Sequence, residues 1–112
     1  MFSTVSNLSK WPRRVIAQDS FARESVKIFK ALGDPTRYEM VCMLLREEEI
    51  RCGRFQEVFR LNAPTLSHHY RVLTNAGLIE SRRDGQNVIH RANRQRLRMF
   101  VPAFERVHAL AE

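Results

Sequence analysis

The stretch "LNAPTLSHHYRVLTNAGLIESRRDGQNVIHRA" (Leu61–Ala92) changes its periodicity halfway along. In its first half, Leu66, Tyr70 and Leu73 fall on one side of a helical wheel, which predicts an amphipathic helix. In its second half the apolar residues alternate with period two on either side of an Asp-Gly pair at 84–85. That pattern is a strong signal for a β-hairpin. The stretch therefore predicts one helix followed directly by a two-stranded hairpin.

Capping residues upstream divide the chain into further helices. A helical face begins at Phe21, and Asp19 or Ser20 can cap this first helix, which Gly33 ends. Asp34 is a good cap for the next helix, with Pro35 at the first position, where its missing N–H costs nothing. This second helix is apolar on most sides, which is typical of a central, buried element.

A third, short helix opens at Gly53 and has Phe55, Val58 and Phe59 predicted to face inward. Only a few residues separate it from Asn62, which can cap the helix over residues 63–75. Two helices joined by so short a turn match a helix-turn-helix. A last helix follows Asn93, with a kink or a fresh start expected at Pro102.

The order is four helices, a hairpin and a helix, which predicts a mainly α fold with a small β hairpin, the winged helix-turn-helix. We assign residues 1–18 to a basic N-terminal arm and residues 19–112 to the winged helix-turn-helix domain. A chain of 112 residues has the length of one compact domain.

The charge balance points to a polyanionic partner. Nineteen Lys and Arg face twelve Asp and Glu, for a formal net charge of +7, and only three of the basic residues are Lys. Guanidinium forks suit phosphate and guanine edges. No stretch approaches the roughly 20 apolar residues that span a bilayer, and no signal peptide is recognisable. Two cysteines form no disulfide framework, so a reduced cytoplasm is the simplest setting.

The helix over residues 63–75 turns a polar set of side chains away from its apolar anchors. These are Pro64, Ser67, His68 and Arg71, with Thr65 on the flank. A hydroxyl, an imidazole and a guanidinium are groups that bind base edges and phosphates of double-stranded DNA. A solvated helix face that happens to be polar is the alternative interpretation. His68 and His69, at i and i+1, cannot converge on one metal ion from a regular helix.

Three segments together resemble the ArsR/SmtB family of winged-helix transcriptional repressors. They are "LGDPTR" (32–37), "SHHYRVLTNAGLI" (67–79) and "RRDGQNVIHR" (82–91), and the likeness covers roughly Ser20 to Leu110. The resemblance implies a homodimer built through the first and last helices, bound to a two-fold symmetric operator and released by an effector. It implies recognition-helix contacts from Ser67, His68 and Arg71, and wing contacts from Arg82, Arg83, Gln86 and Asn87. An ordinary edge hairpin kept soluble by its charges is the alternative for the wing.

The chain departs from the metal sensors of this family. Arsenic and lead sensors carry a Cys-x-Cys pair where this chain has Arg51, Cys52 and Gly53, so both ligand positions are lost. Zinc and nickel sensors draw ligands from the last helix, where this chain offers only Glu105, His108 and Glu112. We therefore expect no metal site and no cofactor.

The two thiols leave a redox alternative open. Cys42 falls on a core-facing stripe, whereas Cys52 lies near a helix start between Arg51 and Arg54, where positive charge stabilises a thiolate. The prediction is a DNA-binding repressor, with a thiol-based redox repressor using Cys42 and Cys52, or a winged-helix protein-interaction module, as alternatives. No nucleophile–base pair, phosphate-binding glycine loop or paired carboxylates indicate an enzyme. The effector is not identifiable.

Overall fold

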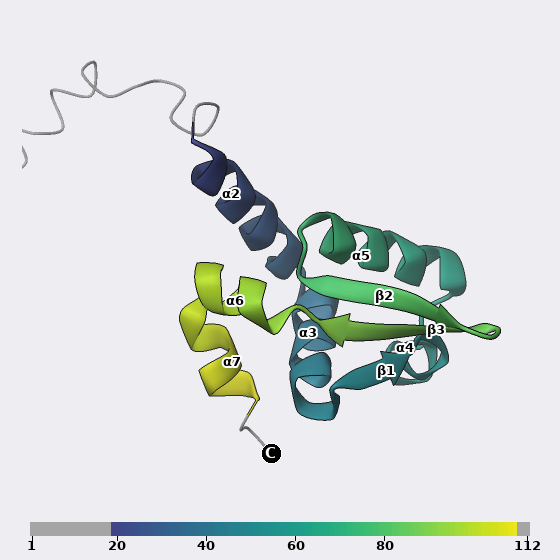
Figure 1. Ribbon diagram of the computed structural model, residues 1–112. Coiled ribbons are helices and arrows are strands. Elements are labelled where there is room, and N and C mark those ends of the chain that lie inside the picture. Colours follow the sequence, from purple (N-terminus) through teal and green to yellow (C-terminus); the bar gives the residue numbers. More distant parts are fainter. Residues whose placement is uncertain (1–18, 110–112) are drawn as a thin grey trace, which may run out of the picture.

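The computed structural model describes residues 19–109, which form six helices and a three-stranded antiparallel sheet with one open face (Figure 1). The proposed arm over residues 1–18 lies outside this range. The elements are α2 (Ser20–Leu32), α3 (Pro35–Glu47), β1 (Glu49–Arg51), α4 (Cys52–Phe59), α5 (Ala63–Asn75), β2 (Ile79–Asp84), β3 (Asn87–Ala92), α6 (Arg94–Phe100) and α7 (Pro102–His108). The helix-turn-helix and the hairpin wing are confirmed.

Four helices begin where their capping side chains predict. The carboxylate of Asp19 accepts hydrogen bonds from the backbone N–H groups of Phe21 and Ala22 at the start of α2. Asp34 caps α3, Asn62 caps α5 and Asn93 caps α6 in the same way. Each cap satisfies backbone donors that the first helical turn leaves unpaired.

The strand β1 was not predicted from the sequence. The sequence patterns indicated only the two strands of the hairpin, but Glu49–Arg51 pairs with β3 in a sheet of order β1-β3-β2. Ile50 lies opposite His90, and it is the one buried residue of this strand. As a result α4 begins at Cys52, one residue before the predicted start at Gly53.

The core is built around α3, in which every residue from Met40 to Leu45 is buried. Helices α2, α5 and α7 contact α3, and so do β1 and β3. Phe55 of α4 is fully buried in this core, but Val58 is 49% exposed, so the prediction that Val58 faces inward is wrong. Helix α4 has eight residues and turns only a narrow side towards the core.

The last helical segment breaks at Pro102 into α6 and α7, as predicted. Figure 1 shows the pair folded back at one end of the molecule, beside α2 and α3, while the tip of the wing lies at the other end. Among residues 19–109, no helix combines the length and apolar character that a membrane span requires.

Candidate nucleic-acid interface

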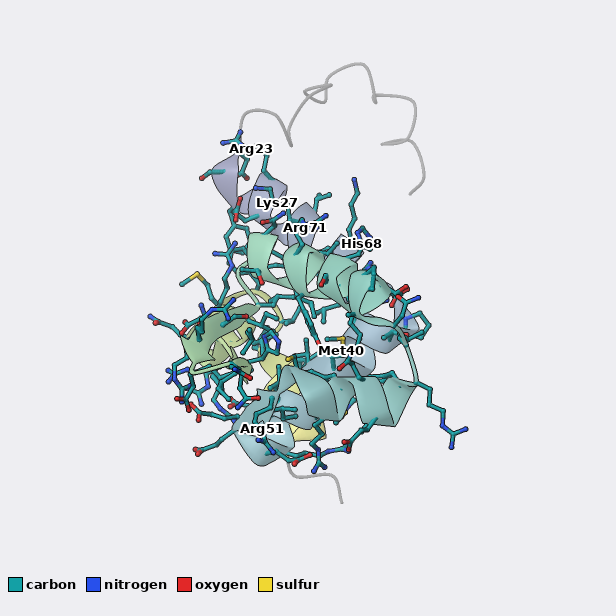
Figure 2. The ribbon with its side chains drawn as sticks, turned by 90° about the vertical axis from the view of Figure 1, so that its right-hand side faces the viewer. Arg23, Lys27, Met40, Arg51, His68 and Arg71 are labelled. Atoms are coloured by element: carbon teal, nitrogen blue, oxygen red, sulfur yellow. The ribbon has the colours of Figure 1, made fainter. Side chains whose placement is uncertain are left out.

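Helix α5 has one buried side and one open side. Leu66 and Leu73 are buried, which fixes the helix on the core. The predicted contact residues on the other side are all exposed: Pro64, Thr65, Ser67, His68 and Arg71. Figure 2 shows His68 and Arg71 directed away from the body of the protein along the outer edge of α5. The open side therefore offers hydroxyl, imidazole and guanidinium groups to a ligand as large as a duplex.

The two neighbouring histidines have different environments. Whereas His68 is exposed, only 12% of the His69 side chain is accessible, and its Nδ1 lies 3.1 Å from Arg37 Nη1. Burial lowers the pKa of His69 below its ordinary value, which keeps the ring neutral and able to accept this hydrogen bond. Arg37 also donates from Nε to the carbonyl oxygen of Ala31 at 2.8 Å. His69 thus orients α5 against the junction of α2 and α3.

Helix α2 extends the basic edge of α5. In Figure 2, Arg23 and Lys27 lie on the same side of the molecule as Arg71, whereas Arg51 lies on the opposite side. The Lys27 ammonium is 3.3 Å from a carboxylate oxygen of Glu24, with more than half of the lysine side chain exposed. Sequence reasoning missed this flank because α2 and α5 are distant in the chain. The one local signal for this flank is the i, i+4 spacing of Arg23 and Lys27, which places both side chains on one side of a helix.

The wing places its two arginines on opposite faces of the sheet. Alternation along β2 puts Arg83 on the same face as Ser81, which is the face that α5 covers. Arg82 lies on the outer face, where Nη1 and Nη2 donate to the Glu49 carboxylate at 2.8 and 3.3 Å. Gln86 and Asn87 are exposed at the turn. The structure brings Arg83 to the α5 side, and it gives Arg82 an acidic partner instead.

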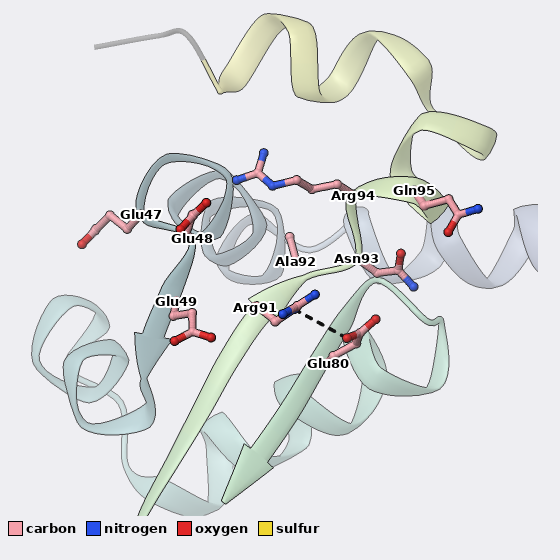
Figure 3. Close-up of a pocket in the computed structure, with 9 residues that line it drawn as sticks. All are labelled: Glu47, Glu48, Glu49, Glu80, Arg91, Ala92, Asn93, Arg94 and Gln95. Carbon is pink, nitrogen blue, oxygen red and sulfur yellow. Dashed lines mark ion pairs between the residues drawn. The ribbon is translucent and has the colours of Figure 1, made fainter. Parts of the chain in front are cut away.

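The outer face of the sheet carries charges of both signs. A surface pocket of about 560 Å³ at the ends of β1 and β3 is lined by Glu47, Glu48, Glu49 and Glu80 and also by Arg91 and Arg94 (Figure 3). Glu80 forms an ion pair with Arg91 at 3.6 Å, which Figure 3 marks with a dashed line. The mixed charges of this face make it less suited to phosphates than the basic edge of α2 and α5.

Comparison with known proteins agrees with this geometry. Residues 34–81 match the family described as "Bacterial regulatory protein, arsR family". An uncharacterised HTH-type transcriptional regulator of Methanocaldococcus jannaschii is 38% identical over 63 residues, which are 55% of this chain and 70% of that protein. The chain belongs to the arsR family of bacterial regulatory proteins.

Two further relatives extend the likeness. The transcriptional repressor SdpR of Bacillus subtilis is 35% identical over 66 residues, covering 59% of this chain and 72% of the repressor. The structure of HlyU from Vibrio cholerae superimposes with a TM-score of 0.67 at 26% identity, over 80% of this chain and 92% of HlyU. The M. jannaschii protein and SdpR are both named as regulators of transcription rather than as enzymes.

The metal-ligand candidates of this ArsR-family chain are engaged with other side chains. Glu105 accepts from Arg98 Nε at 2.5 Å and from Arg94 Nη1 at 2.8 Å, and these guanidinium groups lower its pKa to about 2. The His108 Nε2 is 2.6 Å from the Tyr38 hydroxyl. Glu112 lies outside the described residues. Within residues 19–109 no three His, Cys, Asp or Glu side chains are arranged to hold a metal ion.

The two cysteines are both free thiols. Cys42 is buried in α3, and burial raises the pKa of its thiol, which makes it a poor nucleophile. Cys52 is half-buried and is the first residue of α4. Its predicted place near a helix start is therefore confirmed. The Tyr70 hydroxyl of α5 donates to the Cys52 carbonyl oxygen at 3.4 Å, which connects the two helices of the helix-turn-helix.

Proposed function

We propose that this ArsR-family protein is a DNA-binding transcriptional repressor that acts in the cytoplasm as a homodimer on a two-fold symmetric operator. The observation that carries the proposal is the division of α5 between anchoring and exposed residues. Leu66 and Leu73 fix the helix on the core, and the exposed side presents Ser67, His68 and Arg71. SdpR, a relative of similar sequence, is named a transcriptional repressor.

Exposed apolar side chains on the first and last helices support the homodimer. Phe29 of α2 is 58% exposed, Met99 of α6 is 59% exposed and Val107 of α7 is 57% exposed. Phe21 is also exposed while it stacks on Phe100 of α6 at a ring distance of 4.7 Å. Large apolar side chains gathered on one end of a protein mark an interaction surface. A second copy of the chain would cover it.

The contacts with DNA follow from the direction of each side chain. Arg71, His68 and Ser67 would read base edges in the major groove, while Pro64 and the Thr65 side chain would contact the duplex from the first turn of α5. Arg83, Gln86 and Asn87 would contact the backbone or minor groove from the wing. Arg82 would join them by exchanging Glu49 for a phosphate, at small cost because exposed ion pairs contribute little.

A gel-shift titration on the DNA upstream of the chain's own gene tests the function. Arg71→Ala should weaken specific binding by about 1–3 kcal/mol, roughly 5- to 150-fold, if the guanidinium reads a base. Arg51→Ala is the matched control, because Arg51 is exposed on the opposite side of the molecule and should leave the affinity within about twofold.

Two results would contradict the proposal. If Arg71→Ala binds the operator as tightly as the parent protein does, the open side of α5 does not read DNA. If no upstream fragment competes better than random DNA at any salt concentration, the winged helix serves as a protein-interaction module. Binding that falls steeply with salt would agree with arginine–phosphate contacts and counterion release.

A further inference from the structure

A small pocket lies behind the recognition helix, between α4, α5 and β3. Its volume is about 190 Å³, and Cys52, Gln56, Ser67, Tyr70, Val88 and His90 form most of its lining. A dry protein cavity of about 150 Å³ is large enough to bind benzene. The pocket therefore has room for one six-membered ring with one or two small substituents. None of the lining residues carries a formal charge at neutral pH.

His90 gives this pocket an unused polar group. The side chain is 2% exposed, and its Nδ1 lies 2.7 Å from the Ser81 hydroxyl oxygen. Its other nitrogen, Nε2, is the single buried side-chain N or O atom within residues 19–109 that has no hydrogen-bond partner. Leaving a buried polar group unsatisfied costs about 1–3 kcal/mol. His90 is one of the residues that line the pocket, so a bound molecule that reaches this atom would satisfy it.

The rings around His90 define the shape of the ligand. Tyr70 lies against His90 with ring centroids 4.2 Å apart and an interplanar angle of 32°, and Phe55 follows at 5.9 Å. Flat aromatic molecules pack well in such surroundings. A charged ligand would lose its hydration without gaining a partner of opposite charge, so the pocket favours neutral molecules.

The tautomer of His90 selects the polar group of the ligand. Burial lowers the pKa of His90 to about 4, so the ring is neutral at pH 7. If Nδ1 accepts from Ser81, Nε2 carries a proton and needs an acceptor. If Nδ1 donates to Ser81, Nε2 has a lone pair and needs a donor. A hydroxyl group is both donor and acceptor, so it satisfies either tautomer.

We propose that the pocket binds a small neutral aromatic molecule carrying a hydroxyl group, with the hydroxyl on His90 Nε2 and the ring beside Tyr70. Such a molecule would act as an effector of DNA binding, because Ser67 both lines the pocket and lies on the proposed DNA-reading side of α5. Occupying the space between α5 and the wing changes how the two present themselves to DNA and weakens operator binding. The weakening of operator binding rests on the proposed function, whereas the binding of the aromatic molecule to the pocket does not.

The test compares p-cresol with p-xylene, which replaces the hydroxyl by a methyl group of similar size. Binding to the full chain is followed by NMR titration, with no DNA present. We expect p-cresol to bind at least about tenfold tighter, the factor that corresponds to one hydrogen bond to an otherwise unpaired group. Equal affinities, or no binding of either compound, would overturn the proposal.

Cys52 supplies a second readout on the unaltered protein. The chain has two cysteines and Cys42 is buried, so a thiol reagent applied to the folded protein reports on Cys52. Saturating p-cresol should slow the reaction of Cys52 several-fold, whereas p-xylene at the same concentration should not. An unchanged rate with p-cresol at saturation would mean that the ligand sits elsewhere.

Variants assign the hydroxyl to its partner. His90→Phe should bring the ratio of the two affinities close to one, and His68→Phe, which alters an exposed ring outside the pocket, should leave it unchanged. A ratio that survives in His90→Phe refutes the assignment. If that variant does not fold, the two measurements on the parent protein still decide. A gel shift with and without p-cresol tests the effector role separately. If the protein fails to bind DNA in the absence of p-cresol, that result counts against the proposed function and not against the ligand site.

Discussion

Glu105 connects the two halves of the broken C-terminal helix. Its carboxylate in α7 accepts hydrogen bonds from Arg98 and Arg94 of α6, on the other side of Pro102. Arg94 in turn donates to the carbonyl oxygen of Leu45 near the end of α3, at 3.0 Å. Replacing the carboxylate by the neutral amide in Glu105→Gln removes the charge that holds both guanidinium groups. We expect this substitution to weaken the packing of the elbow, the bend at Pro102 between α6 and α7, against α3.

The magnitude follows from the pKa of this carboxyl group. Its pKa is lowered from 4.5 to about 2 by hydrogen bonds from Arg98 and Arg94. Between folded and unfolded chains that difference corresponds to a ceiling of roughly 3 kcal/mol. The Arg98 side chain is 61% exposed, so solvent screens part of the interaction, and about 1–2 kcal/mol is the expected loss in Glu105→Gln.

The pH dependence distinguishes charge from packing. Because the folded pKa is below the unfolded one, the stabilisation is fully present above pH 4.5 and is lost as the pH falls towards 2. The free energy of unfolding is measured by urea titration at one fixed protein concentration, at about pH 7 and at steps down to about pH 3. The gap between the parent and Glu105→Gln should be widest at neutral pH and shrink below pH 4.5.

Glu57→Gln is the matched control, since Glu57 is exposed on α4. This variant should stay within about 0.5 kcal/mol of the parent across the whole series. A gap for Glu105→Gln that remains constant with pH would show that the substitution disturbs packing rather than charge. The absence of any gap at neutral pH would refute the view that these ion pairs hold the elbow.

Two further substitutions probe the wing junction and the apolar end. Gly77→Ala should lower the free energy of unfolding by about 1–3 kcal/mol in thermal or urea unfolding, because φ is 73° and the new Cβ would lie 2.7 Å from Arg96 Cδ. Gly85→Ala is the control: φ is 64° there but the space around the residue is open, so the loss should be smaller. Equal losses in the two variants would contradict this reasoning. Phe29→Glu should dissociate the proposed homodimer, as measured by sedimentation velocity. Val58→Glu is the control, because Val58 is an exposed apolar residue on α4, and this variant should remain dimeric. A dimer that survives Phe29→Glu would exclude the exposed side of α2 from the interface.

Local signals in the sequence were sufficient for the helices and the hairpin. Asp34, Asn62 and Asn93 act on backbone groups within three residues of themselves, so their capping role is readable without the fold. The helical period likewise predicted the buried side of α5, on which Leu66 and Leu73 lie. Cap and period are properties of one short segment, and tertiary contacts did not override them here.

The elements that were missed depend on partners far along the chain. The three-residue strand β1 is defined by its pairing with residues 89–91 of β3, and nothing in the residues around Ile50 alone predicts this. The partner of Arg82 also needed the structure. Alternation along a strand predicts that Arg82 and Arg83 face opposite sides, but the ion pair with Glu49 depends on where β1 lies. The same holds for Lys27, whose place beside Arg71 depends on how α2 and α5 pack.

Four consecutive residues of α5 explain how reading and regulation can share one helix. Ser67 and His68 are exposed to a partner, whereas His69 contacts Arg37 and Tyr70 lies against His90. A helix transmits displacement rigidly over so short a distance, because each backbone group is hydrogen-bonded to the next turn. If a molecule bound at His90 displaces Tyr70 together with the helix backbone, His68 on the proposed DNA-reading side would move as well. The proposed pocket would then act on the proposed DNA contacts through less than one turn of α5.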